Sequence, residues 1–147
     1  MQKLLDSCAQ ALIDTTPQIL QTIRVEMRRG RGADISIPQF RTLRFIQRHP
    51  DSSLSGLAEH LGLTLPSVSK LVDGLVKQQL LSRKESAEDR RKITLLLTEM
   101  GTSIVDSARA DARTNLVKKL KHLSDDDLKT ISKAMLILHP IFADQDK

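Results

Sequence analysis

Aromatic residues are scarce in this sequence of 147 residues, which contains no tryptophan, no tyrosine and three phenylalanines. Proteins that bind RNA or single-stranded DNA stack bases on aromatic side chains, so this scarcity argues against that class. A single cysteine, Cys8, cannot form an internal disulfide. That use of cysteine is typical of a reducing compartment, and we expect a cytoplasmic protein.

Long apolar runs are absent as well. No stretch approaches the roughly 18 apolar residues of a membrane-spanning helix. Segment 1–12 lacks the apolar core and the cleavage site of a signal peptide. With 39% hydrophobic and 28% charged residues, the chain predicts one soluble domain over 1–147 that has no membrane partner.

Catalytic motifs and metal-ligand spacings are also missing. The sequence has no HExxH motif, no glycine-rich phosphate loop and no nucleophile motif. Its four histidines lack the spacing of metal ligands; they are His49, His60, His122 and His139. We therefore predict no enzyme, no metal and no cofactor. A zinc-sensing regulator, whose ligands converge only in space, has no support from the sequence.

Positive charge is concentrated in one part of the chain. The formal net charge is +5, and residues 17–49 alone balance to +5, because seven arginines oppose only Glu26 and Asp34. Such a concentration favours a surface that binds a polyanion. A solvated, arginine-rich helix surface would give the same pattern.

Segment 54–73 predicts two short helices joined by a tight turn. Gly62 stands where the turn needs a positive φ, and the small Ala58 stands where the helices cross. Thr64 is placed to cap the second helix, and Pro66 is tolerated in its first turn. Together with the spacing of the apolar residues, these features are typical of a helix-turn-helix whose second helix enters a DNA groove.

A hairpin is predicted directly after the helix-turn-helix. Its first strand covers 80–85, residues 86–89 form a polar turn, and the second strand ends at 97. The second strand opens with three consecutive cations, Arg90, Arg91 and Lys92. In this order the elements indicate a winged helix, in which the cations reach phosphates or the minor groove. The alternative is a solvated surface turn.

Apolar residues at helical spacing flank this unit on both sides. Thr16-Pro17 is expected to break the N-terminal helical region or to start a fresh helix. The fold class is therefore mostly α (α+β): a winged helix-turn-helix core with a small β-hairpin wing. In this interpretation 37–98 is the DNA-binding lobe, and 1–30 plus 99–147 are N- and C-terminal dimerisation helices.

The apolar faces of the terminal helices need another surface to pack against, and a second copy of the chain would supply that surface. A homodimer also has the two-fold symmetry that helix-turn-helix proteins use to bind half-sites about 34 Å apart. A monomer whose end helices fold over the core is the less economical alternative.

Two stretches resemble the MarR family of bacterial transcription regulators. They are SLSGLAEHLGLTLPSVSKLVDGLVKQQLLSR (53–83) and DRRKITLLLTEMG (89–101). The second is similar to the family's wing signature, an Asp-x-Arg followed by a strand that ends in Leu-Thr and by a helix. The resemblance covers nearly all of the chain, including the flanking helices with which the family dimerises.

The resemblance implies roles for particular residues. It places Arg91 at the wing tip in the minor groove, braced by Asp89, and Asp73 as a frequent partner of that arginine. Base-edge contacts fall to Ser67, Ser69 and Lys70, with Thr64 and Pro66 near phosphates or thymine methyl groups. This chain departs from the family in the wing, where Ser86-Ala87-Glu88 stands in place of the usual Asp-Pro.

The resemblance also implies an effector, since the family's usual ligands are small aromatic or phenolic anions. They bind between the dimerisation helices and the DNA-binding lobe. Candidates for such a pocket are Arg24, Arg28, Phe40 and Arg44, each equally explained as a core residue or a phosphate contact. One branch of the family senses peroxides through an N-terminal cysteine supported by tyrosines. Because this chain has no tyrosine, we expect Cys8 to be a buried structural thiol.

These observations predict a sequence-specific regulator of transcription, a repressor, that binds a palindromic operator in double-stranded DNA as a homodimer. A small aromatic or anionic ligand is expected to release it. Two alternatives stay open: a redox-responsive regulator that uses Cys8, and a winged-helix module that binds protein instead of DNA.

Overall fold

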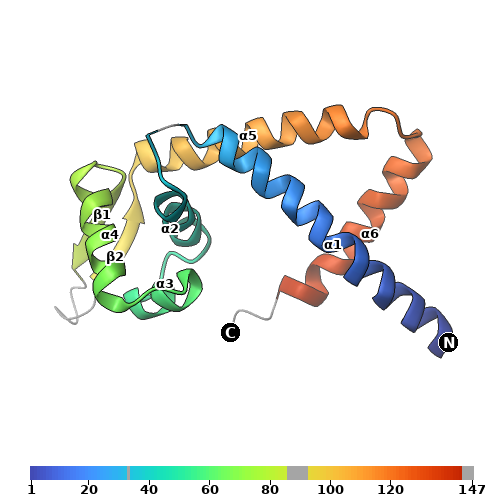
Figure 1. The fold of residues 1–147 in the computed structure, drawn as a ribbon, viewed down its shortest axis with the longest axis horizontal. Helices are drawn as coiled ribbons and strands as arrows, with labels where there is room; N and C mark the ends of the chain where they lie inside the picture. Colours follow the sequence, from blue (N-terminus) through green and yellow to red (C-terminus); the bar gives the residue numbers. More distant parts are fainter. Residues whose placement is uncertain (33, 86–92, 144–147) are drawn as a thin grey trace. The chain divides into compact units, whose positions relative to one another are not determined.

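The computed structural model describes residues 1–32, 34–85 and 93–143 of the chain (Figure 1). Its elements follow in the order α1 (Gln2–Gly30), α2 (Ile37–Arg48), α3 (Leu54–Leu61), α4 (Leu65–Lys77), β1 (Leu81–Glu85), β2 (Ile93–Leu97), α5 (Glu99–Leu120) and α6 (Asp125–Ala143). The chain forms two compact units, Met1–Ala112 and Arg113–Lys147, which divide within α5. The single domain predicted over 1–147 stays a prediction.

Hydroxyl side chains fix the starts of the helices. At α2, Ser36 and Gln39 form a reciprocal capping box, in which each side chain accepts a hydrogen bond from the other residue's backbone N–H. Ser53 accepts a hydrogen bond from the backbone N–H of Gly56 at 3.1 Å and begins α3. Thr64 accepts a hydrogen bond from the backbone N–H of Ser67 and begins α4, as the sequence predicted. These caps satisfy backbone donors that the first turn of a helix leaves without a partner.

Helix α1 runs without interruption from Gln2 to Gly30, with Pro17 inside it. The break or fresh start expected at Thr16-Pro17 is therefore wrong. A proline inside a helix removes one backbone hydrogen bond. Because residues 13–20 are all exposed, the carbonyl group that loses its partner stays accessible to water.

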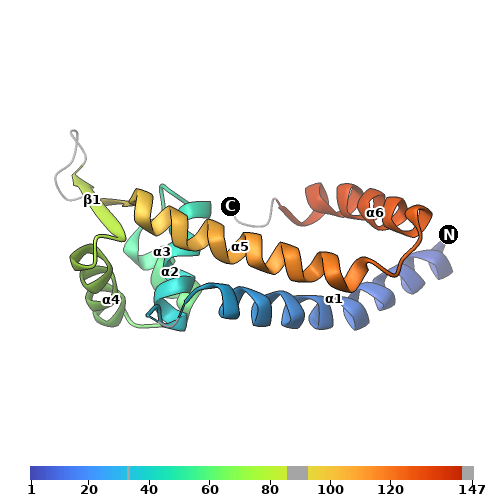
Figure 2. The same ribbon diagram turned by 90° about the horizontal axis from the view of Figure 1, so that it is seen from above.

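The core of the first unit lies among α2, α3, α4 and the start of α5. Its fully buried side chains include Leu43, Leu57, Val68, Val72, Leu75, Leu81 and Val105. Figures 1 and 2 show α2, α3, α4 and the hairpin gathered beyond the C-terminal end of α1. Gly62 ends α3 with φ 67°, so the positive φ predicted for the turn is confirmed. Elements α2 to β2 span Ile37–Leu97, and the division into a DNA-binding lobe over 37–98 and dimerisation helices stays a prediction.

Strands β1 and β2 pair antiparallel, from Leu81 opposite Leu97 to Glu85 opposite Ile93. Leu81 and Leu95 are buried in the core. Ile93, at the outer end of the hairpin and beyond the core, is exposed.

Two glycines mark close approaches between elements of the first unit. A Cβ atom at Gly101 would collide with the carbonyl oxygen of Leu80, and one at Gly30 would lie 2.8 Å from the Cα atom of Ala108. Real Cβ atoms essentially never approach another atom this closely. Because Gly101 has no side chain, the start of α5 can pack against Leu80, just after α4. Because Gly30 has none, the end of α1 can pack against α5 at Ala108.

The second unit contains the end of α5 and helix α6. Ser124 accepts a hydrogen bond from the backbone N–H of Asp127 at 3.2 Å and caps the start of α6. Helix α6 buries none of its side chains within the described chain. Its exposed apolar residues are Ile131, Met135, Leu136, Ile137, Ile141 and Phe142. No helix in the described part of the chain combines the length and apolarity needed to cross a bilayer.

Glycine-to-alanine substitutions should act in opposite directions at two helical positions. Gly101→Ala should lower the free energy of unfolding by about 1–3 kcal/mol, because the added methyl group collides with the Leu80 carbonyl. Gly74→Ala should raise it by up to about 1 kcal/mol, since nothing lies within 4 Å of the added Cβ atom. Urea unfolding at one protein concentration measures both changes. A Gly101→Ala variant as stable as the parent would contradict the close approach.

Candidate nucleic-acid interface and cationic pocket

The first turns of α4 present polar side chains to solvent. Pro66, Ser67 and Lys70 are exposed, and Ser69 is half-buried. The Thr64 hydroxyl accepts a hydrogen bond from the backbone N–H of Ser67 and donates one to the Ser67 Oγ at 2.9 Å. The structure thus brings together, at one end of one helix, the five helix residues for which the family resemblance implied contacts with bases or phosphates.

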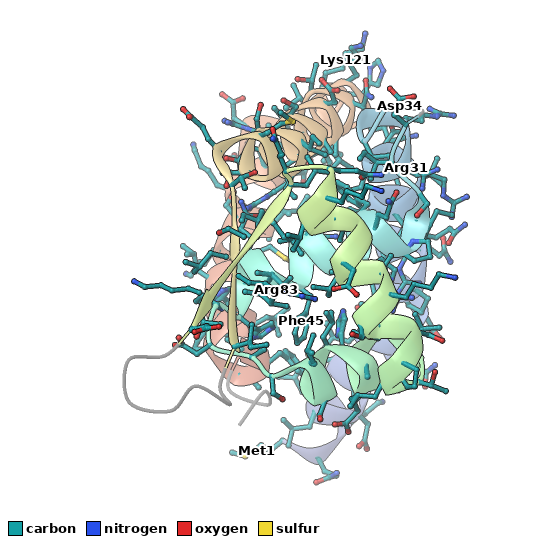
Figure 3. All side chains as sticks on the ribbon, turned by 90° about the vertical axis from the view of Figure 1, so that its left-hand side faces the viewer. Met1, Arg31, Asp34, Phe45, Arg83 and Lys121 are labelled. Carbon is teal, nitrogen blue, oxygen red and sulfur yellow. The ribbon has the colours of Figure 1, made fainter. Side chains whose placement is uncertain are left out.

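Asp73, farther along α4, forms an ion pair with Arg83 of β1. Figure 3 shows Arg83 extending from the hairpin toward α4. The pair joins the helix predicted to enter the groove to the hairpin predicted to act as the wing. Sequence reasoning missed Arg83. It lies two residues after the buried Leu81 and thus on the same face of the strand, which was the available signal.

The implied wing-tip residues Asp89, Arg90, Arg91 and Lys92 lie outside the described residues. The pairing of Asp73 with Arg91 therefore stays a prediction, beside the observed pairing with Arg83. The described hairpin ends at the pair Glu85 and Ile93, on either side of residues 86–92.

A pocket of about 400 Å³ lies between α1, α2 and α3. All four residues proposed from the sequence line it: Arg24, Arg28, Phe40 and Arg44. Sequence reasoning missed three further arginines of the lining, namely Arg31, Arg41 and Arg48. Helical spacing was an available signal, because 24, 28 and 31 share one face of a helix, as do 41, 44 and 48.

The pocket combines apolar and cationic surfaces. Its apolar lining comes from Leu20, Ile23, Met27, Ile37, Phe40 and Phe45. The ring of Phe45 contacts two imidazoles, with its centroid 4.8 Å from that of His49 and 4.6 Å from that of His60. None of the described residues that line the pocket is acidic. Burial lowers the pKa of Arg44, and the neighbouring cations Arg48 and Arg109 lower it further.

Cys8 is exposed on α1, so the expectation of a buried thiol is wrong for the single chain. No side chain in the N-terminal half of α1 is buried in the first unit. The helical spacing of the apolar residues around Cys8 predicts a helix, but it does not predict whether that helix is covered. Among the described residues, no group of three or more His, Cys, Asp or Glu side chains is placed to hold a metal ion.

Known proteins share both the sequence pattern and the fold. Residues 33–92 match the model of the MarR family. The HTH-type transcriptional regulator YfiV of Bacillus subtilis (strain 168) is 30% identical over 105 residues. That alignment covers 71% of this chain and 66% of YfiV, just under two thirds of the relative's own length.

Two solved structures resemble the chain in fold. The transcriptional regulator Tm0710 from Thermotoga maritima superimposes with a TM-score of 0.79 at 22% identity, over 91% of this chain and 95% of Tm0710. A point mutant of S. aureus MepR, bound to an oligodeoxyribonucleotide, superimposes with a TM-score of 0.59 at 20% identity, over 88% of this chain and 94% of MepR.

The predicted fold class, a mostly helical winged helix with a two-stranded hairpin, is confirmed. The relatives are transcriptional regulators, in agreement with the prediction that the chain is not an enzyme. The chain belongs to the MarR family of transcription regulators.

Proposed function

We propose that the chain is a repressor that binds a palindromic operator in double-stranded DNA as a homodimer, and that a small anion in the pocket releases it. The observation that carries the proposal is the exposed polar end of α4, held beside the hairpin by the ion pair between Asp73 and Arg83. A dimer seated on an operator represses by excluding other proteins from the same DNA.

The chemistry of α4 suits the major groove. Lys70 carries donors that match the O6 and N7 acceptors of guanine, whereas serine hydroxyls such as Ser67 discriminate weakly between bases. Thr64 and Pro66, in the first turn, are placed to contact phosphates or thymine methyl groups. The structure of MepR with an oligodeoxyribonucleotide supports the proposal, because that protein has the same fold.

Exposed apolar side chains at both ends of the chain support a dimer. On α1 they are Leu4, Leu5, Ile13, Ile19 and Leu20, and α6 carries a further set. Single exposed apolar residues are ordinary, but large sets on a helix indicate an interaction surface. A second copy of the chain would cover them and would place two α4 helices about 34 Å apart, one turn of DNA.

The pocket supports release by a ligand, since α1 and α2 both line it. A ligand shifts a conformational equilibrium only if it binds one arrangement better than the other. An anion that bridges α1 and α2 favours the arrangement in which their arginines lie close together. Because α2 packs on α3 and α4, that arrangement also sets the position of α4.

Selection of bound sequences from random double-stranded DNA tests the core of the proposal. We expect an inverted repeat whose half-sites lie about 34 Å apart centre to centre. The complex should dissociate more readily as salt concentration rises, because phosphate contacts release counterions. If selection enriches no sequence, a winged-helix module that binds protein becomes the better interpretation.

Substitution of Lys70 tests the direct base contact. Lys70→Ala should cost about 1–3 kcal/mol on the selected operator and relax the preference at one base pair in each half-site. Lys118→Ala, which removes an exposed lysine from α5, serves as the control and should leave the preference unchanged. Affinities for the operator and for single base-pair variants supply the measurement. An unchanged sequence preference in Lys70→Ala would refute the assigned contact.

A double-mutant cycle tests the link between α4 and the hairpin. Asp73→Asn and Arg83→Gln should each weaken operator binding, and their coupling energy should be about 0.5–1 kcal/mol. An exposed ion pair adds little to stability, so each variant should lose less than about 1 kcal/mol in unfolding. Lys84→Gln, on the next residue of β1, is the control and should show no coupling to Asp73.

A second cycle, between Asp73→Asn and Arg91→Gln, tests the pairing that the family resemblance implies. Coupling to position 91 and none to position 83 would show that the observed ion pair has no role on DNA.

A further inference from the structure

We propose that the ligand of the pocket is an organic polyanion: an apolar body that carries two or more carboxylate or phosphate groups. The proposal rests on the proposed function for its regulatory consequence, and it goes further by naming the charge that the ligand must have. It follows from the number of arginines in the lining, their lack of partners and the apolar surface between them.

Cations line the pocket from two separate elements. Arg24 and Arg28 lie on α1, and Arg31 follows directly at its end. Helix α2 contributes the other row, Arg41, Arg44 and Arg48. No acidic residue accompanies them among the described residues of the lining.

Five of these six arginines have no ion pair or hydrogen bond with any described residue; they are Arg24, Arg28, Arg31, Arg44 and Arg48. The sixth, Arg41, donates to the backbone carbonyl of His60 at 3.2 Å. The nearby Glu26 pairs with Arg29, which does not line the pocket. The buried Nε atom of Arg31 has no acceptor among the described residues.

Arg31 and Arg44 are half-buried, whereas the other four arginines of the cluster are exposed to water. The cost of the cluster without counter-charge therefore falls mainly on Arg31 and Arg44, because a buried donor without a partner loses the free energy of its hydration and neighbouring guanidinium groups repel one another. The lowered pKa of Arg44, caused by burial and by Arg48 and Arg109, has the same physical origin. One carboxylate relieves one or two guanidinium groups, whereas a ligand with several anionic groups engages both rows at once.

The size and the apolar part of the pocket define the rest of the ligand. A volume of about 400 Å³ falls within the usual range for organic ligands. Phe40, Phe45 and Met27 offer apolar contacts to a ring or a short chain. A small inorganic anion would leave this surface without a partner, so the anionic groups belong on an apolar body.

A matched series of ligands tests the charge requirement with the intact protein and without DNA. Benzoate, isophthalate and trimesate carry one, two and three carboxylates on the same ring, and calorimetry at pH 8 and constant ionic strength gives their affinities. We expect affinity to rise about tenfold with each added carboxylate, as charge-assisted hydrogen bonds do. Phenyl phosphate against phenyl sulfate, a dianion against a monoanion of similar shape, tests phosphate as the source of charge.

Variants locate the effect. Arg28→Gln and Arg44→Gln should each lower the affinity for trimesate about tenfold and change that for benzoate less. Arg44→Lys keeps the positive charge but loses the planar guanidinium group. Its affinity for trimesate should lie between that of the parent protein and that of Arg44→Gln. Arg113→Gln removes one exposed arginine outside the lining and should leave every affinity unchanged. Circular dichroism confirms that each variant is folded.

The outcomes separate this inference from the proposed function. Benzoate that binds as tightly as trimesate, or an equal loss in Arg113→Gln, would overturn the polyanion ligand. Arginine variants that weaken operator binding or dimerisation, in a protein that binds no trimesate, would also overturn it, because the arginines then serve DNA or a second copy. Polyanion binding without any operator binding would instead refute the proposed function and leave the ligand class standing.

Discussion

The carbonyl group of Leu80 is the point at which α4, the hairpin and α5 are joined. The backbone N–H of Leu80 donates to the Leu75 carbonyl at the end of α4, and its own carbonyl accepts from the backbone N–H of Thr98 at 3.1 Å. Gly101 then lets the first turn of α5 rest against the same carbonyl. Because one residue satisfies all three connections, the directions of the hairpin and of α5 are set relative to α4.

The ion pair between Asp73 and Arg83 depends on that junction. Asp73 lies in the C-terminal half of α4 and Arg83 lies three residues after Leu80, so the two meet only when β1 folds back along the helix. The pair itself is exposed and contributes little to stability. Its effect is to hold one orientation of the hairpin beside the helix that carries Lys70.

The turn before α4 and the start of that helix follow from local sequence signals, whereas the contacts between elements do not. Gly62 and Thr64 fix the turn and the start of α4 through their own φ angle and hydroxyl group, so both were predictable. Gly74 and Gly101 are both helical glycines, yet one has open space around it and the other touches a backbone carbonyl. That difference comes from tertiary packing, which no local pattern encodes. The partner of Asp73 and the uninterrupted course of α1 through Pro17 depend in the same way on what surrounds each residue.

The arginine pocket and the DNA-binding lobe share a physical dependence, because α2 belongs to both. One face of α2 buries Leu43 and Ile46 in the core against which α4 packs, while Arg44 and Arg48 face the pocket. In the proposed function, an anion between α1 and α2 would offset the repulsion among the pocket arginines and attract both helices. Because α2 also packs on α4, binding of that anion would favour one position of α4.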